Sequence, residues 1–158
     1  MRQEEPEYFY PNVNIEAVYG TFPWNIFDGG RIFNFNTHVS IEEVNNILFT
    51  YHSYGVASRL VYTNCRLTPE NYKNKFGNIC LSLCNEYANN QVVIADDDFL
   101  NYIHERYENL SFLSSTTKCL NATDLQKEFD DPRFIEVCLD YNLNHYWKML
   151  DFLTDEQK

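Results

Sequence analysis

Residues 110–118, LSFLSSTTK, join an apolar run of strand length to five consecutive small hydroxyl-bearing or cationic side chains. This pattern is typical of a buried strand that delivers polar groups at its carboxyl end. The same order recurs at 59–64 (RLVYTN), 91–98 (QVVIADDD) and 134–144 (FIEVCLDYNLN). Because parallel α/β proteins place their binding residues at the carboxyl ends of their strands, the repetition predicts both a fold class and a site location.

Amphipathic segments with helix-capping residues separate these runs. We expect strands over 12–21, 56–64, 91–95, 110–114 and 134–140, and helices beginning after Ser40, at Lys75, near Phe99, at Asn121 with an Asn or Thr cap, and at His145. The last three connections leave room for one crossover helix and little else, so the strands must run parallel. Residues 1–11 form an acidic lead, and residues 12–158 form a single domain of five parallel βα units.

Two architectures accommodate five βα units: a partial (βα)8 barrel of the TIM type, or an open doubly wound sheet. Doubly wound sheets that bind nucleotides carry a glycine-rich turn directly after the first strand. Gly20 stands alone at that position. The sequence therefore favours the partial barrel.

Composition narrows the class of protein. The 158 residues are 44% hydrophobic and 22% charged, which is ordinary for a globular domain. The net charge is −11 and the sequence has no basic cluster, so we expect no direct binding to the phosphate backbone of nucleic acids. The start is acidic, and no eighteen apolar residues run together, so we expect no membrane association and a cytoplasmic location. Five scattered cysteines indicate buried, reduced thiols.

The candidate ligand-binding residues lie at the ends of the expected strands, with Arg59 inside one. An arginine within an apolar strand must be paired with a carboxylate or with a ligand, and Asp140 is the candidate partner. Lys118 would supply a counter-charge to an anionic ligand. The complete predicted set is Arg31, Arg59, Thr63, Asn64, Ser115, Lys118, Asp140 and Asn142. No catalytic residue is identified, because no base partner or G-x-S-x-G elbow frames the serines.

Two further patterns have competing interpretations. In Asp96-Asp97-Asp98, the second or third residue is expected to cap the following helix, although the run could also supply a general base or a metal ligand. Cys80 and Cys84 have the CxxxC spacing that begins a radical-SAM cluster motif, but Tyr87 stands where the third cysteine belongs. Two cysteines on a packed helix face are the better interpretation. The dispersed histidines predict no metal site.

Several blocks resemble a known family. They are GTFPWNIFDGGR, YHSYGVASRLVYTN, QVVIADDDFLNYIHERY, LSFLSSTTKC and VCLDYNLN, which together cover nearly the whole chain. They look like an uncharacterised gut-bacterial and phage-encoded family with the motifs G-x-F-P…N-G-G-R, S-S-T-T-K and V-L-D-Y-x-L-N. That family is distantly similar to the collagenase-like peptidase superfamily of barrel proteins, which includes iron–sulfur-dependent hydroxylases. The chain departs from the pattern at Asp28, His104 and Glu108, where Asn, Arg and Pro are usual.

The resemblance carries further implications. Members of the family continue for several strands and then carry a cysteine-rich segment, so this chain corresponds to a truncated barrel without cofactor ligands. An iron–sulfur cluster would be possible only in a longer product. A barrel cut after its fifth unit would leave two strand edges, which a second copy or a partner chain would have to cover.

Three hypotheses follow for the function. The first is a barrel protein that binds a small or anionic ligand at the carboxyl ends of its strands. The second is a non-catalytic phage or accessory module for protein contacts, and the third is a radical-SAM-like iron–sulfur protein. The sequence names neither a reaction nor a substrate.

Overall fold

The structure is a computed structural model, and it describes residues 13–29, 33–34, 37–118, 121–143, 148, 151 and 153–154. Its centre is a five-stranded parallel sheet with the strand order β1-β2-β3-β4-β5. The strands are β1 (Ala17–Gly20), β2 (Ala57–Tyr62), β3 (Gln91–Ile94), β4 (Ser111–Ser114) and β5 (Phe134–Val137). The predicted α/β class with five parallel strands is thus confirmed.

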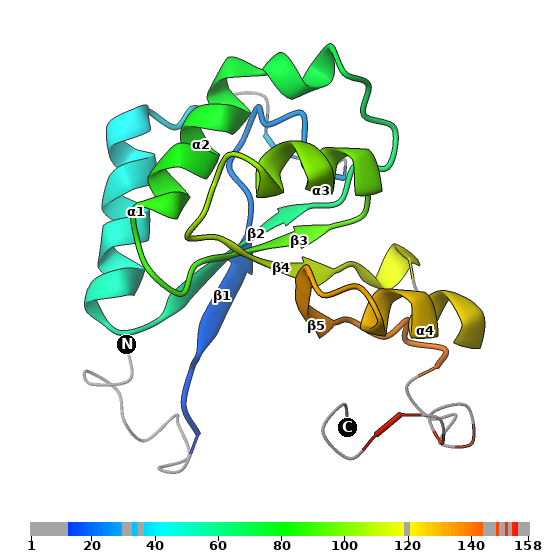
Figure 1. Ribbon diagram of the computed structural model, residues 1–158. Coiled ribbons are helices and arrows are strands. Elements are labelled where there is room, and N and C mark those ends of the chain that lie inside the picture. Colours follow the sequence, from blue (N-terminus) through cyan, green and yellow to red (C-terminus); the bar gives the residue numbers. More distant parts are fainter. Residues whose placement is uncertain are drawn as a thin grey trace.

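Helices alternate with the strands. They are α1 (Ile41–Ser53), α2 (Lys75–Asn85), α3 (Asp97–His104) and α4 (Ala122–Phe129), with short 3₁₀ turns η2 (Asn71–Lys73) and η3 (Thr116–Lys118). Figure 1 shows α1, α2 and α3 on one side of the sheet, with α4 beside β5. A doubly wound sheet reverses its strand order at a switch point, whereas this order is sequential throughout, as in a (βα)8 barrel.

The helices begin and end where their capping residues stand. Ser40 and Glu43 form a reciprocal capping box at the start of α1, and Gly55, with a φ of 70°, follows its end. Asn121 caps α4 through its side chain, which decides between the two predicted caps, Asn and Thr. The prediction for α3 is wrong in detail, because the cap is Asp96. Its carboxylate accepts the Phe99 backbone N–H at 2.7 Å, which leaves Asp97 inside the helix and free to face η3.

The two faces of the sheet differ in their side chains. In β2 the buried residues alternate, and Ser58, Leu60 and Tyr62 face the helices. With residues of β3, β4 and the helices, Leu60 and Tyr62 form one core. Neighbouring strands are in register on the other face, where Tyr19, Arg59, Gln91 and Ser111 stand side by side. We call this set the cross-strand row.

A β-bulge interrupts the pairing of β4 with β5. Phe112 pairs with Phe134 and Leu113 with Glu136, so Ile135 is the extra residue and is exposed. Regular alternation after Phe134 would turn Glu136 towards the helices. The bulge instead places Glu136 beside Leu113, on the face that carries the cross-strand row.

Several expected features lie outside the described residues. They are the acidic lead of residues 1–11, the predicted binding residue Arg31, and most of the expected last helix over 145–153. The first strand, β1, is shorter than the predicted strand over 12–21. Val13 and Ile15 precede β1, and both are exposed. Among the described residues, no helix has both the length and the apolar character needed to cross a membrane.

Candidate functional site

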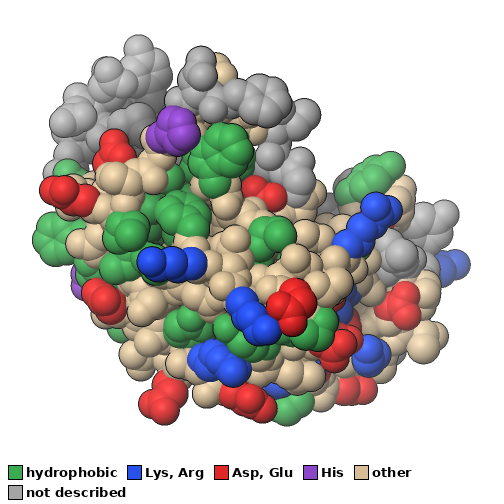
Figure 2. All heavy atoms as spheres, turned by 90° about the horizontal axis from the view of Figure 1, so that it is seen from above, with side chains coloured by type: hydrophobic (Ala, Val, Ile, Leu, Met, Phe, Trp, Pro, Cys, Tyr) green, Lys and Arg blue, Asp and Glu red, His purple; other side chains and the backbone are tan. Residues whose placement is uncertain are grey.

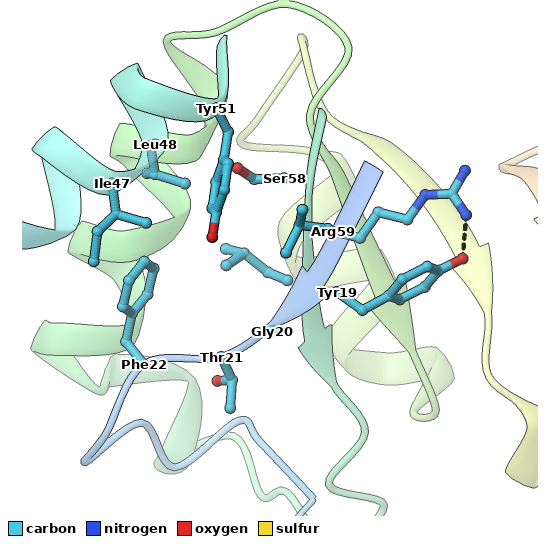
Figure 3. A pocket seen from close by; sticks show the side chains of 11 residues that line it. Tyr19, Gly20, Thr21, Phe22, Ile47, Leu48, Tyr51, Ser58 and Arg59 are labelled. Carbon is cyan, nitrogen blue, oxygen red and sulfur yellow. Dashed lines mark hydrogen bonds between the residues drawn. The ribbon is translucent and has the colours of Figure 1, made fainter. Parts of the chain in front are cut away.

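Arg59 is the most unusual side chain of the sheet. It projects from the middle of β2, and its side chain is only 13% exposed. Its guanidinium donates to the Tyr19 hydroxyl, as Figure 3 shows, and forms an ion pair with Glu136 at 2.9 Å. The predicted partner, Asp140, is therefore wrong. The bulge in β5 explains the difference, because it turns Glu136 to the Arg59 side.

The charge of Arg59 is stabilised by these partners. Burial alone would lower its pKa, but the Tyr19 hydroxyl and the Glu136 carboxylate outweigh burial, so the pKa is raised above its ordinary value. The guanidinium is thus a permanent cation on the sheet face. Glu136 is 43% exposed, so the anionic partner is the accessible half of the pair.

Two polar atoms of the cross-strand row are buried without a hydrogen-bond partner. They are Nε of Arg59, a donor, and Oε1 of Gln91, an acceptor. The two residues are register neighbours on β2 and β3. A buried donor or acceptor without a partner costs about 1–3 kcal/mol. A ligand that offers an acceptor to Arg59 Nε and a donor to Gln91 Oε1 would remove this cost.

A second polar cluster occupies the carboxyl ends of β3 and β4. Lys118 Nζ contacts Glu128 at 2.8 Å and also contacts Asp97, and Ser114 Oγ donates to Glu128 at 2.7 Å. The Lys118 and Glu128 side chains are 9% and 4% exposed. Lys127 approaches the outer side of Asp97 at 3.4 Å. We call Asp97, Ser114, Lys118 and Glu128 the lysine cluster.

The lysine cluster is compensated internally. Burial would lower the pKa of Lys118, but its hydrogen bonds to Asp97 and Glu128 raise it. The same contacts lower the pKa of Asp97 against the opposing effect of burial. Lys118 is consequently a protonated amine with two carboxylate partners, and it has little charge to offer an anionic ligand at neutral pH.

The other predicted binding residues have structural contacts. Asn64 donates from Nδ2 to the Ile26 carbonyl at 2.9 Å and anchors the loop after β1. Thr63 packs against Gly29, where an added Cβ would lie 2.3 Å from its hydroxyl oxygen. Ser115, directly before η3, bonds through its hydroxyl to the Thr117 hydroxyl at 3.0 Å, and Asp140 accepts from Asn142 in a local turn at 2.8 Å.

The structure thus divides the predicted set. Ser115 directly precedes η3 and Lys118 ends it, and the Lys118 N–H donates to the Ser115 carbonyl at 3.0 Å. Thr63 and Asn64 contact the loop after β1. Arg59 lies apart from both of these groups, on the sheet face opposite the helices. Sequence reasoning missed Tyr19, Gln91 and Glu136. Strand alternation could have found Tyr19 and Gln91, but the bulge that delivers Glu136 leaves no signal in the sequence.

The cysteines follow the prediction in part. Cys80 and Cys84 are buried on the core side of α2, and burial raises the pKa of each thiol to about 12. Such thiols are poor metal ligands because the thiolate form is disfavoured. Cys65 is exposed, so the prediction of burial is wrong for that residue. Within the described ranges, no three His, Cys, Asp or Glu side chains are grouped to hold a metal ion.

Comparisons with protein-family models, with curated proteins and with solved structures find no match to this chain.

Proposed function

We propose that the protein binds a small ligand with an acidic or amide-like group on the sheet face that carries the cross-strand row, with Arg59 as the anchor. The observation that carries this proposal is the pair of unpartnered buried atoms, Arg59 Nε and Gln91 Oε1. A primary amide offers an acceptor and a donor side by side, which complements this pair, and an ionised carboxylic acid offers two acceptor oxygens to the Arg59 donors.

Glu136 can be replaced by a ligand as the partner of Arg59. Its carboxylate is the more exposed partner of Arg59, so an incoming acidic group can compete for the guanidinium while Glu136 turns to solvent. Tyr19 contributes a hydroxyl at the edge of the row, with the Arg59 guanidinium 4.9 Å from the centre of its ring. This site lies on the strands themselves, whereas the lysine cluster lies beyond their ends.

The resemblance to the collagenase-like peptidase superfamily belongs to the same proposal. The sequential strand order supports a barrel relationship, because a barrel has its strands in this order. In a barrel, the face opposite the helices is the interior. The cross-strand row would then form an interior layer.

Isothermal titration calorimetry with a panel of small carboxylic acids and primary amides tests the proposal. We expect at least one compound to bind the wild-type chain and to lose affinity at least tenfold in Arg59→Met. The matched control is Arg66→Met, which removes an exposed arginine and should leave affinity unchanged. A panel without binders, or equal affinity in wild type and Arg59→Met, would contradict the proposal.

A protein-contact module is the second candidate, and exposed apolar side chains favour it. Ile41, Ile47 and Phe49 of α1 are 49%, 39% and 56% exposed. Figure 2 shows hydrophobic side chains gathered on the side where α1 lies, while Lys and Arg are scattered among Asp and Glu. This candidate expects a complex that Phe49→Ser dissociates and Arg59→Met does not, as measured by sedimentation velocity.

A further inference from the structure

A hollow of about 170 Å³ lies between β1 and α1, on the helix side of the sheet. Figure 3 shows its setting, with Ile47, Leu48 and Tyr51 of α1 facing the strands and Phe22 below them. Cavities of about 150 Å³ in other proteins accept molecules as large as benzene. This hollow is therefore large enough for a single aromatic ring.

Gly20 creates the space. It is the register partner of Leu60, so its missing side chain would point towards the helices. A Cβ built on Gly20 meets no atom within 4 Å, whereas one at Gly29 or Gly77 would clash. The hollow is thus an unfilled position of the core layer between β1 and α1.

Most of the wall is apolar, but buried hydroxyls interrupt it. Ser58 is 5% exposed, and its Oγ has no hydrogen-bond partner, as is also true of the buried Thr21 Oγ1. The Ser58 backbone N–H, in contrast, donates to Asn90 at 2.8 Å. Ser58 and Thr21 both line the hollow. An isolated buried hydroxyl is unfavourable unless something bonds to it, so these groups indicate a ligand with a polar atom.

Tyr51 lies beside the Ser58 hydroxyl. Figure 3 shows this hydroxyl pointing towards the Tyr51 ring, and both residues line the hollow. Tyr51 lies in the last turn of α1 and is only partly buried. Movement of this ring would expose Ser58 Oγ to a molecule in the hollow.

We propose that the hollow is a binding site for a small uncharged molecule with an aromatic or compact aliphatic body and one hydroxyl group. The body packs against Val18, Phe22 and Ile47, and the hydroxyl bonds to Ser58 Oγ. Tyr19 and Arg59 also line the hollow, but the hydrogen bond between the Arg59 guanidinium and the Tyr19 hydroxyl is directed away from it. The hollow and the proposed acidic-ligand site thus share strands β1 and β2 but lie on opposite faces of the sheet.

Heteronuclear NMR titration with p-cresol, compared with toluene, tests the proposal. We expect p-cresol to shift the amide signals of Val18, Gly20 and Ile47, and toluene to bind about threefold to tenfold more weakly, since it lacks the hydrogen bond. Ser58→Ala should reduce p-cresol affinity to that of toluene. Ser82→Ala, an exposed change on α2, should leave p-cresol affinity unchanged.

A second variant makes the test independent of the hydroxyl. Gly20→Val should fill the hollow, abolish the shifts from both compounds and keep the fold, because a Cβ at this position meets no atom within 4 Å and the γ-carbons would extend into the hollow. Gly20→Ala should give an intermediate loss, which covers the case in which the valine variant fails to fold. Retention of p-cresol binding by both glycine variants, or equal binding of toluene and p-cresol, would overturn the proposal.

Discussion

Lys118 shows how a residue can fit a functional pattern and be occupied by the fold. Its place after four hydroxyl-bearing residues suggests a ligand contact, but its ammonium lies between Asp97 and Glu128. Its charge also lies 4.8 Å from the Phe134 ring centre. The cluster connects α3, η3 and α4 at the carboxyl ends of β3 and β4, so we assign it to stability.

Lys118→Met should destabilise the protein by about 3–5 kcal/mol, because Glu128 would remain buried without its cationic partner. Urea unfolding followed by circular dichroism measures this change. The matched control is Lys127→Met, which removes an exposed lysine from the same Asp97 carboxylate and should cost less than about 0.5 kcal/mol.

The double variant Lys118→Met/Glu128→Gln separates charge from packing. Removing the buried carboxylate should restore more than half of the lost free energy of unfolding, since no unpaired charge remains. A double variant as unstable as Lys118→Met would show that the lysine acts through its packing instead.

Pairings of single residues were the least predictable feature of the sequence. The prediction that Arg59 must be paired with a carboxylate or with a ligand rested on desolvation. Arg59 does have a carboxylate partner, but the identity of that partner depended on a bulge. The cap of α3 is Asp96, and not Asp97 or Asp98 as predicted. Three consecutive aspartates are equivalent in sequence, and only the end of β3 at Ile94 decides that Asp96 is the cap.

At the scale of the element, the sequence was more informative. The five strands and the first four helices were predicted with the right type and order because apolar periodicity and capping residues are local signals. The strand ends were placed too far out in β1 and β5, since a parallel strand ends where its neighbour's pairing ends. The exposed Val13 and Ile15 show that alternation alone does not make a strand.

The capping box of α1 permits an element-scale prediction. The Ser40 Oγ accepts the Glu43 backbone N–H at 3.1 Å, and the Ser40 N–H donates to the Glu43 carboxylate at 2.7 Å. Ser40→Ala should lower the free energy of unfolding by about 1 kcal/mol. Amide hydrogen exchange should accelerate most in the first turn of α1.

Ser82→Ala on α2 provides the control for the Ser40 variant, because that serine is exposed and lies inside a helix. It should leave stability the same or slightly higher, since alanine favours helix interiors. Equal effects of the two substitutions would mean that the cap does not stabilise α1.

At the scale of the whole molecule, the sequential strand order determines which residues can meet. Sequential parallel strands place their crossover helices on one face, so the other face is available for polar contacts between strands. The alternation of β2 could be anticipated, but not which distant strands would exchange side chains. That depends on sheet curvature, which has no local signal.

The Arg59–Glu136 pair tests that curvature. It joins β2 to β5 across β3 and β4, and three strand spacings amount to about 14 Å in a flat sheet. In a double-mutant cycle of Arg59→Met and Glu136→Gln, we expect a coupling energy of about 1 kcal/mol, measured by urea unfolding. The exposed pair Glu70 and Lys73, local in sequence, should couple by less than about 0.5 kcal/mol. Zero coupling between Arg59 and Glu136 would mean that the sheet does not bring β2 and β5 together in solution, and the acidic-ligand site would lose its exchangeable partner.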